Sequence, residues 1–121
     1  MYDHIGLKVE DLDAAVDFYR AALKPLGHVL ASRDATGAGL GPPGEPALWL
    51  YRGAPAAKVH VAFRAADRRA VDRFHASGLE AGGRDNGRPG PRTDYSPTYY
   101  AAFLIDPDGN NVEAVCTGPA A

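Results

Sequence analysis

Two histidines and one glutamate in this chain have the types and spacing of a divalent-metal site. His4 and His60 each begin an alternating apolar segment, and Glu113 lies in a third such segment near the end of the chain. Two imidazoles and one carboxylate can form a facial triad, which leaves coordination positions open for a substrate or water. A strand histidine can also be only a hydrogen-bonded polar group, and a glutamate in a last strand can simply be solvated. Residue types alone leave both interpretations open.

Strand alternation predicts that the three side chains share one face. Around Glu113, the neighbours Val112 and Ala114 are apolar and are expected to pack on a helix, which turns the carboxylate away from that helix. His4 and His60 likewise alternate with aliphatic residues and are expected on the face opposite to them. The three polar side chains are therefore expected on one side of the sheet structure.

An internal repeat accounts for the equivalent positions of the two histidines. Aligning His4 with His60 also aligns Asp11 with Asp67, each at an expected helix N-cap. Helical spacing predicts a helix after each aspartate, and glycine and proline near residues 25–27 and 82–83 end these helices. The expected core residues of the helices are Leu12, Ala15, Val16, Tyr19, Ala22 and Leu23 in the first, and Ala70, Val71, Phe74, Gly78 and Leu79 in the second.

Each half continues as three shorter strands. The first half predicts them at 28–34, 38–41 and 46–53, and the second at 82–87, 98–105 and 110–116, with a tight turn at 106–110. The segment 82–97 also has the composition of a long loop, either a solvated connector or a lid over a substrate. The sequence thus predicts one α+β domain over residues 1–121, built from βαβββ modules at about 1–56 and 57–121.

Composition excludes several classes of protein. The chain has 121 residues, 45% of them hydrophobic and 23% charged, with a formal net charge of -2. This balance predicts a folded protein without general affinity for nucleic acid or anionic membranes. The start of the sequence lacks a signal-peptide pattern, no apolar run is long enough for a membrane span, and a lone Cys116 cannot form an internal disulfide. We therefore expect a soluble, cytoplasmic protein.

Three motifs give the sequence a resemblance to a known superfamily. They are the opening "DHIGLKVEDLDAAVDFYRAAL", the central "VHVAFRA" and the closing "FLIDPDGNNVEAV". With the paired modules, they resemble the vicinal oxygen chelate superfamily, which includes glyoxalase I, extradiol dioxygenases, fosfomycin-resistance thiol transferases, methylmalonyl-CoA epimerase and bleomycin-resistance proteins. The resemblance implies the glyoxalase/bleomycin resistance/dioxygenase fold, in which the strands of both modules form a curled mixed sheet around a cleft.

The resemblance also implies a metal and the residues that hold it. Metal ligands in that superfamily match His4, His60 and Glu113, and the ion would be Fe, Mn, Ni or Zn. A small substrate would chelate the metal through neighbouring oxygens, in an isomerase, lyase, thiol-transfer or dioxygenase reaction, with Glu113 as the base. Small members are often homodimers, so the resemblance makes a homodimer possible here, and the sequence itself identifies no interface for it.

Two positions depart from the relatives. Glyoxalase I has a fourth ligand at the position of Trp49, where indole offers no suitable lone pair. Extradiol dioxygenases and the fosfomycin enzymes carry a tyrosine at the position of Phe103. Tyr95, Tyr99 or Tyr100 could supply that hydroxyl, and strand parity with Phe103 favours Tyr99 as a catalytic partner, although all three could instead be packing residues.

Other side chains are candidate substrate contacts. Trp49 is either core filling or a flat cleft wall, and Phe103 and Tyr95 could also line the cleft. Arg64 shares the expected face of His60, and Arg84, Arg88 and Arg92 lie in the 82–97 segment, where they could bind an anionic group or remain solvated. An aromatic cleft without chemistry, as in a bleomycin-resistance-type binding protein, is the alternative function.

Overall fold

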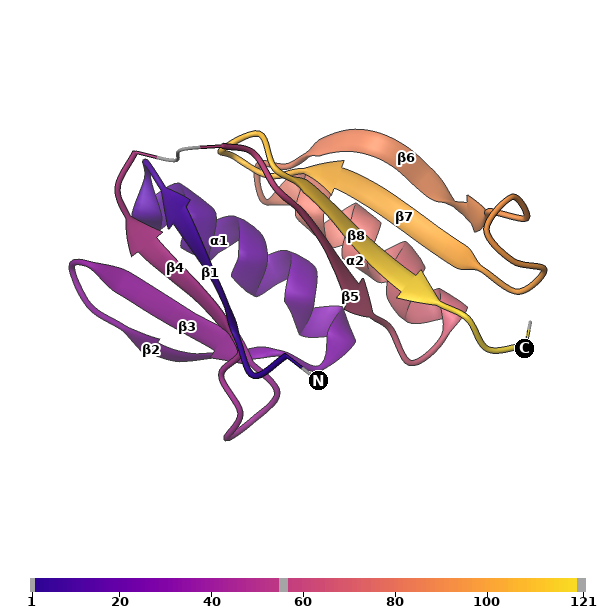
Figure 1. Ribbon diagram of the computed structural model, residues 1–121, viewed down its shortest axis with the longest axis horizontal. Coiled ribbons are helices and arrows are strands. Elements are labelled where there is room, and N and C mark those ends of the chain that lie inside the picture. The colour runs from indigo at the N-terminus through magenta and orange to yellow at the C-terminus, as the bar shows by residue number, and fades with distance from the viewer. Residues whose placement is uncertain (1, 55–56, 120–121) are drawn as a thin grey trace.

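Two copies of one strand–helix–three-strand unit make up the fold (Figure 1). The computed structural model describes residues 2–54 and 57–119, so the expected boundary between the modules at residue 56 lies outside the described residues. The predicted α+β class and the order of elements in both modules are confirmed. The first module contains β1 (Ile5–Val9), α1 (Leu12–Leu23), η1 (Lys24–Leu26), β2 (Val29–Arg33), β3 (Gly37–Gly41) and β4 (Leu48–Arg52), and the second contains β5 (His60–Arg64), α2 (Arg68–Glu80), β6 (Arg84–Pro91), β7 (Tyr100–Ile105) and β8 (Asn111–Cys116).

Each module folds its strands into a four-stranded mixed sheet. The strand orders are β1-β4-β3-β2 and β5-β8-β7-β6. β1 pairs with β4 in parallel and β5 pairs with β8 in parallel, whereas all other neighbours are antiparallel. Among the described residues, no hydrogen-bonded strand pair joins the two sheets. The strands described therefore form two separate sheets that are not closed into one.

Both helices begin at the predicted caps. The Asp11 carboxylate accepts a hydrogen bond from the Ala14 backbone N–H at 3.0 Å, and the Asp67 carboxylate accepts one from Ala70 at 2.8 Å. Each cap satisfies a backbone donor that has no partner within its helix. After η1 the chain reverses at Gly27, whose φ of 87° lies in the left-handed region that favours glycine.

A shared hydrophobic core lies between the helices and one face of each sheet. α1 packs on α2, and the Phe18 ring of α1 fills space left by Gly78 and Gly83 of the second module. The predicted core residues of α1 are all buried. In α2 the prediction for Leu79 is wrong, since this side chain is 41% exposed. His75 is buried instead and forms a 2.8 Å contact with Asp85 of β6.

A buried polar network ties the last turn to the first helix. The Tyr19 hydroxyl of α1 donates to Asp106 Oδ2 at 2.5 Å, and the same carboxylate accepts from the backbone and side chain of Asn110 at 2.7 and 2.9 Å. Burial raises the pKa of Tyr19 well above its ordinary value, with the adjacent Asp106 charge adding to the effect. The predicted 106–110 turn is thus present and is fixed to the first module.

Loss of the Tyr19 hydroxyl should destabilise the protein. Tyr19→Phe removes a donor from a carboxylate that is 2% exposed, and we expect the free energy of unfolding to fall by about 1–3 kcal/mol. Tyr100→Phe is the matched control, because its hydroxyl bonds to Asp72 at an exposed position; its cost should stay within about 0.5 kcal/mol. Urea denaturation measures both changes, and equal losses would contradict the assigned role of the network.

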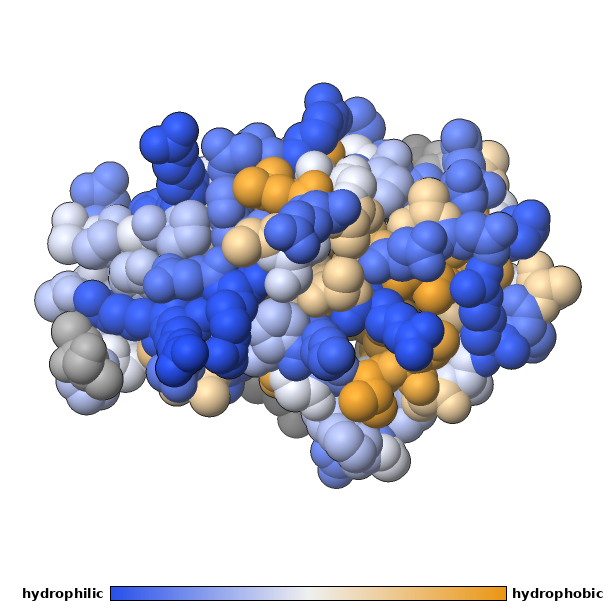
Figure 2. Space-filling view, turned by 180° about the vertical axis from the view of Figure 1, so that it is seen from behind, coloured by the Kyte–Doolittle hydropathy of each residue, from blue (hydrophilic) through white to orange (hydrophobic). Residues whose placement is uncertain are grey.

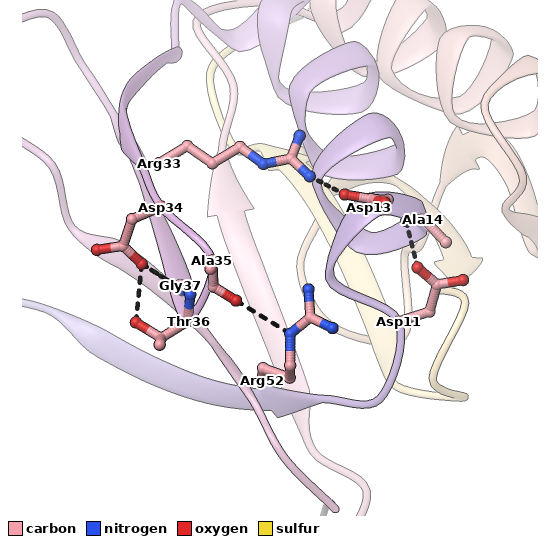
Figure 3. Close-up of polar contacts among 9 residues, drawn as sticks. All are labelled: Asp11, Asp13, Ala14, Arg33, Asp34, Ala35, Thr36, Gly37 and Arg52. Carbon is pink, nitrogen blue, oxygen red and sulfur yellow. Dashed lines mark hydrogen bonds and ion pairs between the residues drawn. The ribbon is translucent and has the colours of Figure 1, made fainter.

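The β2–β3 turn is closed by side-chain contacts (Figure 3). The Asp34 carboxylate accepts hydrogen bonds from Thr36 N and Oγ1, both at 2.8 Å, and from Gly37 N at 3.0 Å. Nearby, the Arg52 Nε donates to the Ala35 carbonyl at 3.1 Å. These contacts fix the hairpin beside β4.

Half of the segment expected as a long loop, residues 84–91, is strand. β6 spans Arg84–Pro91 and pairs with β7, with register shifts on both sides of Gly87. It is an edge strand that alternates poorly because these irregularities interrupt the period-2 pattern and because most of its side chains are exposed. The remaining turn between β6 and β7 covers only residues 92–99.

The side of the molecule behind the sheets is largely hydrophilic. Figure 2 shows this side, where α2 lies, with polar residues covering most of the surface.

No helix within the described ranges is long and apolar enough to cross a membrane.

Candidate metal centre

Glu113 lies on the face of the second sheet that points away from the helices, as strand parity predicts. We call this side of each sheet its open face. Its neighbours Val112 and Ala114 are fully buried in the core, whereas Glu113 stands between Ala62 of β5 and Phe103 of β7 in the same cross-strand row. Side chains of one row project from the same face. The carboxylate is nevertheless buried, with 3% of the residue exposed, and the side chains of His60 and Tyr99 contact its two oxygens.

His60 reaches Glu113 through one ring nitrogen and is oriented through the other. Its Nε2 lies 3.1 Å from Glu113 Oε1, and its Nδ1 lies 3.0 Å from the carbonyl oxygen of Asn111. Because a carbonyl oxygen only accepts hydrogen bonds, Nδ1 carries a proton. Nε2 therefore presents either a second proton or its lone pair to the carboxylate. The neutral form, with the proton on Nδ1 and the lone pair on Nε2, is a tautomer that metal-binding histidines commonly adopt.

Tyr99 holds the second oxygen of the same carboxylate. Its hydroxyl donates to Glu113 Oε2, and burial together with this hydrogen bond raises the pKa of Tyr99 to about 12. The phenol thus stays protonated near neutral pH and remains a donor. With His60 on one oxygen and Tyr99 on the other, the Glu113 carboxylate has a fixed orientation.

His4 does not join this cluster within one chain. It precedes the first residue of β1, and His60 is the first residue of β5; the two strands run in opposite directions (Figure 1), so the histidines lie at opposite ends. No three ligand-type side chains converge in the parts of the chain that the structure describes. His4 Nδ1 instead contacts the Asp3 carboxylate at 2.7 Å, which leaves Nε2 free.

A hollow of about 160 Å³ separates His4 from β5. Its apolar walls include Leu48 of β4 and Val61 and Phe63 of β5, with His28 on one side. The His4 side chain is 55% exposed at this hollow and is accessible from outside the chain.

Trp49 occupies in the first sheet the position that Glu113 occupies in the second. Trp49 is in register with Gly6 and Gly39, just as Glu113 is in register with Ala62 and Phe103. The indole lies flat over Gly39, where a Cβ would approach its ring within 2.6 Å. A half-buried ring on the open face favours the wall interpretation over core filling. The repeat therefore preserves the geometry of the row but replaces the carboxylate by an aromatic ring.

The remaining predicted contacts are distributed around the second sheet. Phe103 stacks on His60 with ring centroids 6.4 Å apart. Tyr95 is 66% exposed and makes an edge contact of 5.0 Å with the Tyr99 ring. Arg64 ends β5 as an exposed side chain opposite Val115. Phe103 thus borders the His60–Glu113 pair, whereas Tyr95 and Arg64 lie at its margin.

Two partners of the candidate ligands were not identified from the sequence. Asp3 directly precedes His4, and an acidic residue next to a histidine is a signal that could have found it. The Asn111 carbonyl that orients His60 is a backbone group, so its role depends on the β5–β8 register alone.

Paired βαβββ modules with a histidine–glutamate pair on an open sheet face define a protein of the vicinal oxygen chelate type. The family model described as "Glyoxalase-like domain" matches residues 4–115, and the chain therefore belongs to this family. No curated protein matches the sequence at a significant level.

Solved structures of family members share the fold. A glyoxalase/bleomycin resistance protein from Albidiferax ferrireducens is 30% identical, covers 95% of this chain and 98% of its own, and superposes with a TM-score of 0.84. A glyoxalase-related enzyme from Fulvimarina pelagi is 18% identical, with 97% and 96% coverage and a TM-score of 0.71. A glyoxalase I variant from Zea mays is 24% identical, and the alignment covers 93% of this chain and 45% of the maize chain with a TM-score of 0.71. The last two establish likeness of fold only.

Proposed function

We propose that this protein is a metal-dependent enzyme of the vicinal oxygen chelate superfamily that acts on a small oxygen-chelating substrate. The observation that carries the proposal is the contact between His60 Nε2 and the Glu113 carboxylate at 3.1 Å, with both groups held by further hydrogen bonds. Two ligand-type groups that face each other in this way offer a site to a divalent cation.

The chemistry of the donor set fits such an ion. With Nδ1 bonded to the Asn111 carbonyl, the neutral His60 ring presents the lone pair of Nε2 toward the Glu113 carboxylate. A lone pair and a carboxylate repel each other unless a cation lies between them. His4, whose Nδ1 bonds to Asp3, has the same free Nε2. Imidazole and carboxylate ligands suit Fe, Mn, Ni or Zn.

We propose that the third ligand comes from a second copy of the chain. His4 and His60 lie at opposite ends of β1 and β5, so one chain holds the ligands in two separate places. A symmetric pair that faces its open sheets together can bring His4 of one copy to the His60–Glu113 pair of the other, twice. The exposed side chain of Tyr51 (46%), which shares the open face with Trp49 two residues earlier in β4, would then be covered.

Each residue of the site has a role in this proposal. The bound ion would supply positive charge that stabilises an oxyanion or enolate on the substrate. Glu113, oriented by Tyr99, is positioned to accept or return a proton on the substrate. Trp49 and Phe103 form flat apolar surfaces that exclude water from the bound substrate. Isomerase, lyase, thiol-transfer and dioxygenase reactions are the candidate reactions for such a site.

Metal content tests the proposal. Protein purified without an affinity tag should contain about one divalent ion per chain by elemental mass spectrometry, and Glu113→Gln and His60→Ala should weaken metal affinity more than about 100-fold. Glu80→Gln makes the same chemical change as Glu113→Gln at an exposed position of α2 and should retain the ion. A wild-type protein that takes up no added metal would overturn the proposal.

A non-catalytic binding protein of the bleomycin-resistance type is the second candidate. The observation that favours it is Trp49 over Gly39, an aromatic surface at the position equivalent to Glu113. In that case, Glu113→Gln would leave ligand affinity nearly unchanged, whereas Trp49→Ala would lower it.

A further inference from the structure

The Phe103 ring lies between Arg92 and the candidate metal centre. It directly follows Pro91, the last residue of β6, and its guanidinium carbon is 5.5 Å from the centroid of the Phe103 ring. The same ring stacks on His60, and Phe103 is in register with Glu113. Arg92, Phe103 and the His60–Glu113 pair therefore follow one another across the open face of the second sheet.

The guanidinium of Arg92 is held in place by the backbone of β6. Its Nη2 donates to the carbonyl of Arg88 at 2.7 Å, and its Nη1 donates to the carbonyl of Gly90 at 2.9 Å. Cβ atoms at Gly87 and Gly90 would lie 3.3 Å and 3.2 Å from its nitrogens, so the glycines leave room for the group. A charged group fixed before binding loses little conformational entropy when a ligand arrives.

Arg92 retains its charge and part of its donor capacity. Carbonyl oxygens orient the guanidinium but do not neutralise it, and none of the ion pairs found within residues 2–54 and 57–119 includes Arg92. A guanidinium has five N–H donors, and the contacts to the carbonyls of Arg88, Gly90 and Pro91 leave the Nε–H and one Nη2 N–H for a ligand. Arg84 and Arg88, which the sequence made equally plausible, are exposed, whereas Arg92 is half-buried.

We propose that Arg92 determines substrate specificity by binding a carboxylate on the far end of the oxygen-chelating substrate. This inference rests on the proposed function, because the chelating oxygens are assigned to the His60–Glu113 end of the row. The substrate class is then a small carboxylic acid with two neighbouring oxygens at the opposite end of the molecule. A planar guanidinium suits this role, since it binds both oxygens of a carboxylate.

Two probes that differ by one carboxylate test the proposal. Catechol and 3,4-dihydroxybenzoate have the same neighbouring hydroxyls, and calorimetry on the Mn²⁺-loaded protein gives their dissociation constants. Wild-type protein should bind 3,4-dihydroxybenzoate about 10-fold more tightly than catechol. Arg92→Gln should abolish this preference and change catechol affinity less than about 2-fold. Arg88→Gln, the exposed neighbour, should keep the wild-type preference.

A carboxylate preference that survives Arg92→Gln, or equal affinities of the wild type for both probes, would overturn the proposal. A second experiment distinguishes failure of the metal site from failure of the Arg92 site. Metal-free protein is titrated with benzoate and with benzamide, and NMR monitors the binding. If the wild type binds neither catechol nor metal but binds benzoate more tightly than benzamide, and Arg92→Gln loses that difference, the anion site stands and the metal proposal fails. If benzoate has no advantage there either, both fail.

Discussion

An equal mixture of His4→Ala and Glu113→Ala chains that exchange subunits should regain metal at about a quarter of its sites, although neither variant alone holds the ion. In a mixed pair, one site inherits both substitutions. The other site combines the intact His4 of one copy with the intact His60 and Glu113 of its partner. This result follows from the opposite ends at which β1 and β5 begin.

The matched control pairs two substitutions from the same half-site. Chains with His60→Ala and Glu113→Ala should show no recovery when mixed, because each site takes both residues from one copy. Co-expression with two different tags and purification of the mixed pair isolate pairs with one intact site of two, so elemental mass spectrometry should find metal at about half of the sites there. A mixture of the His4 and Glu113 variants that remains free of metal would show that one chain supplies all three ligands, or that no pair forms, and gel filtration separates these two outcomes.

Replacement of Phe18 should cause the largest loss of stability. This ring is fully buried between the two modules and makes an edge contact of 4.9 Å with Tyr19. Phe18→Ala would leave a cavity where α1 meets α2, and we expect the free energy of unfolding to fall by about 3–5 kcal/mol. Urea denaturation with an unchanged slope measures the loss.

Gly83 packs against this ring, and its substitution should also destabilise the protein. A Cβ at Gly83 would lie 2.8 Å from the Gly78 carbonyl oxygen and would overlap the Phe18 ring, so Gly83→Ala should cost about 1–3 kcal/mol. Gly53→Ala is the control, because its Cβ would meet only a Lys8 methylene at 3.7 Å. Phe18→Leu combined with Gly83→Ala should cost less than the sum of the two single changes. Strict additivity would show that the ring and the glycine do not share this space.

Local signals predicted most of the fold. Asp11 and Asp67 cap their helices because an N-cap depends on a side chain and the backbone three residues later, both close in sequence. Glu113 could be assigned to the open face because alternation in a strand depends only on parity. β6 and Leu79 were predicted less well, since a bulged edge strand and the last turn of a helix depend on neighbours that the local pattern does not contain.

The sequence by itself determined the two modules, the helix caps, the final turn and the face on which His60 and Glu113 lie, because each depends on contacts between residues near one another in the chain. Tertiary structure alone decided that His4 is separated from the other two candidate ligands, that Trp49 takes the place equivalent to Glu113, and that Arg92 rather than Arg84 or Arg88 lies beside the site. These features depend on strand direction, register and the packing of β6 against β7. Such long-range pairings are set by the fold as a whole and leave no periodic trace in the sequence.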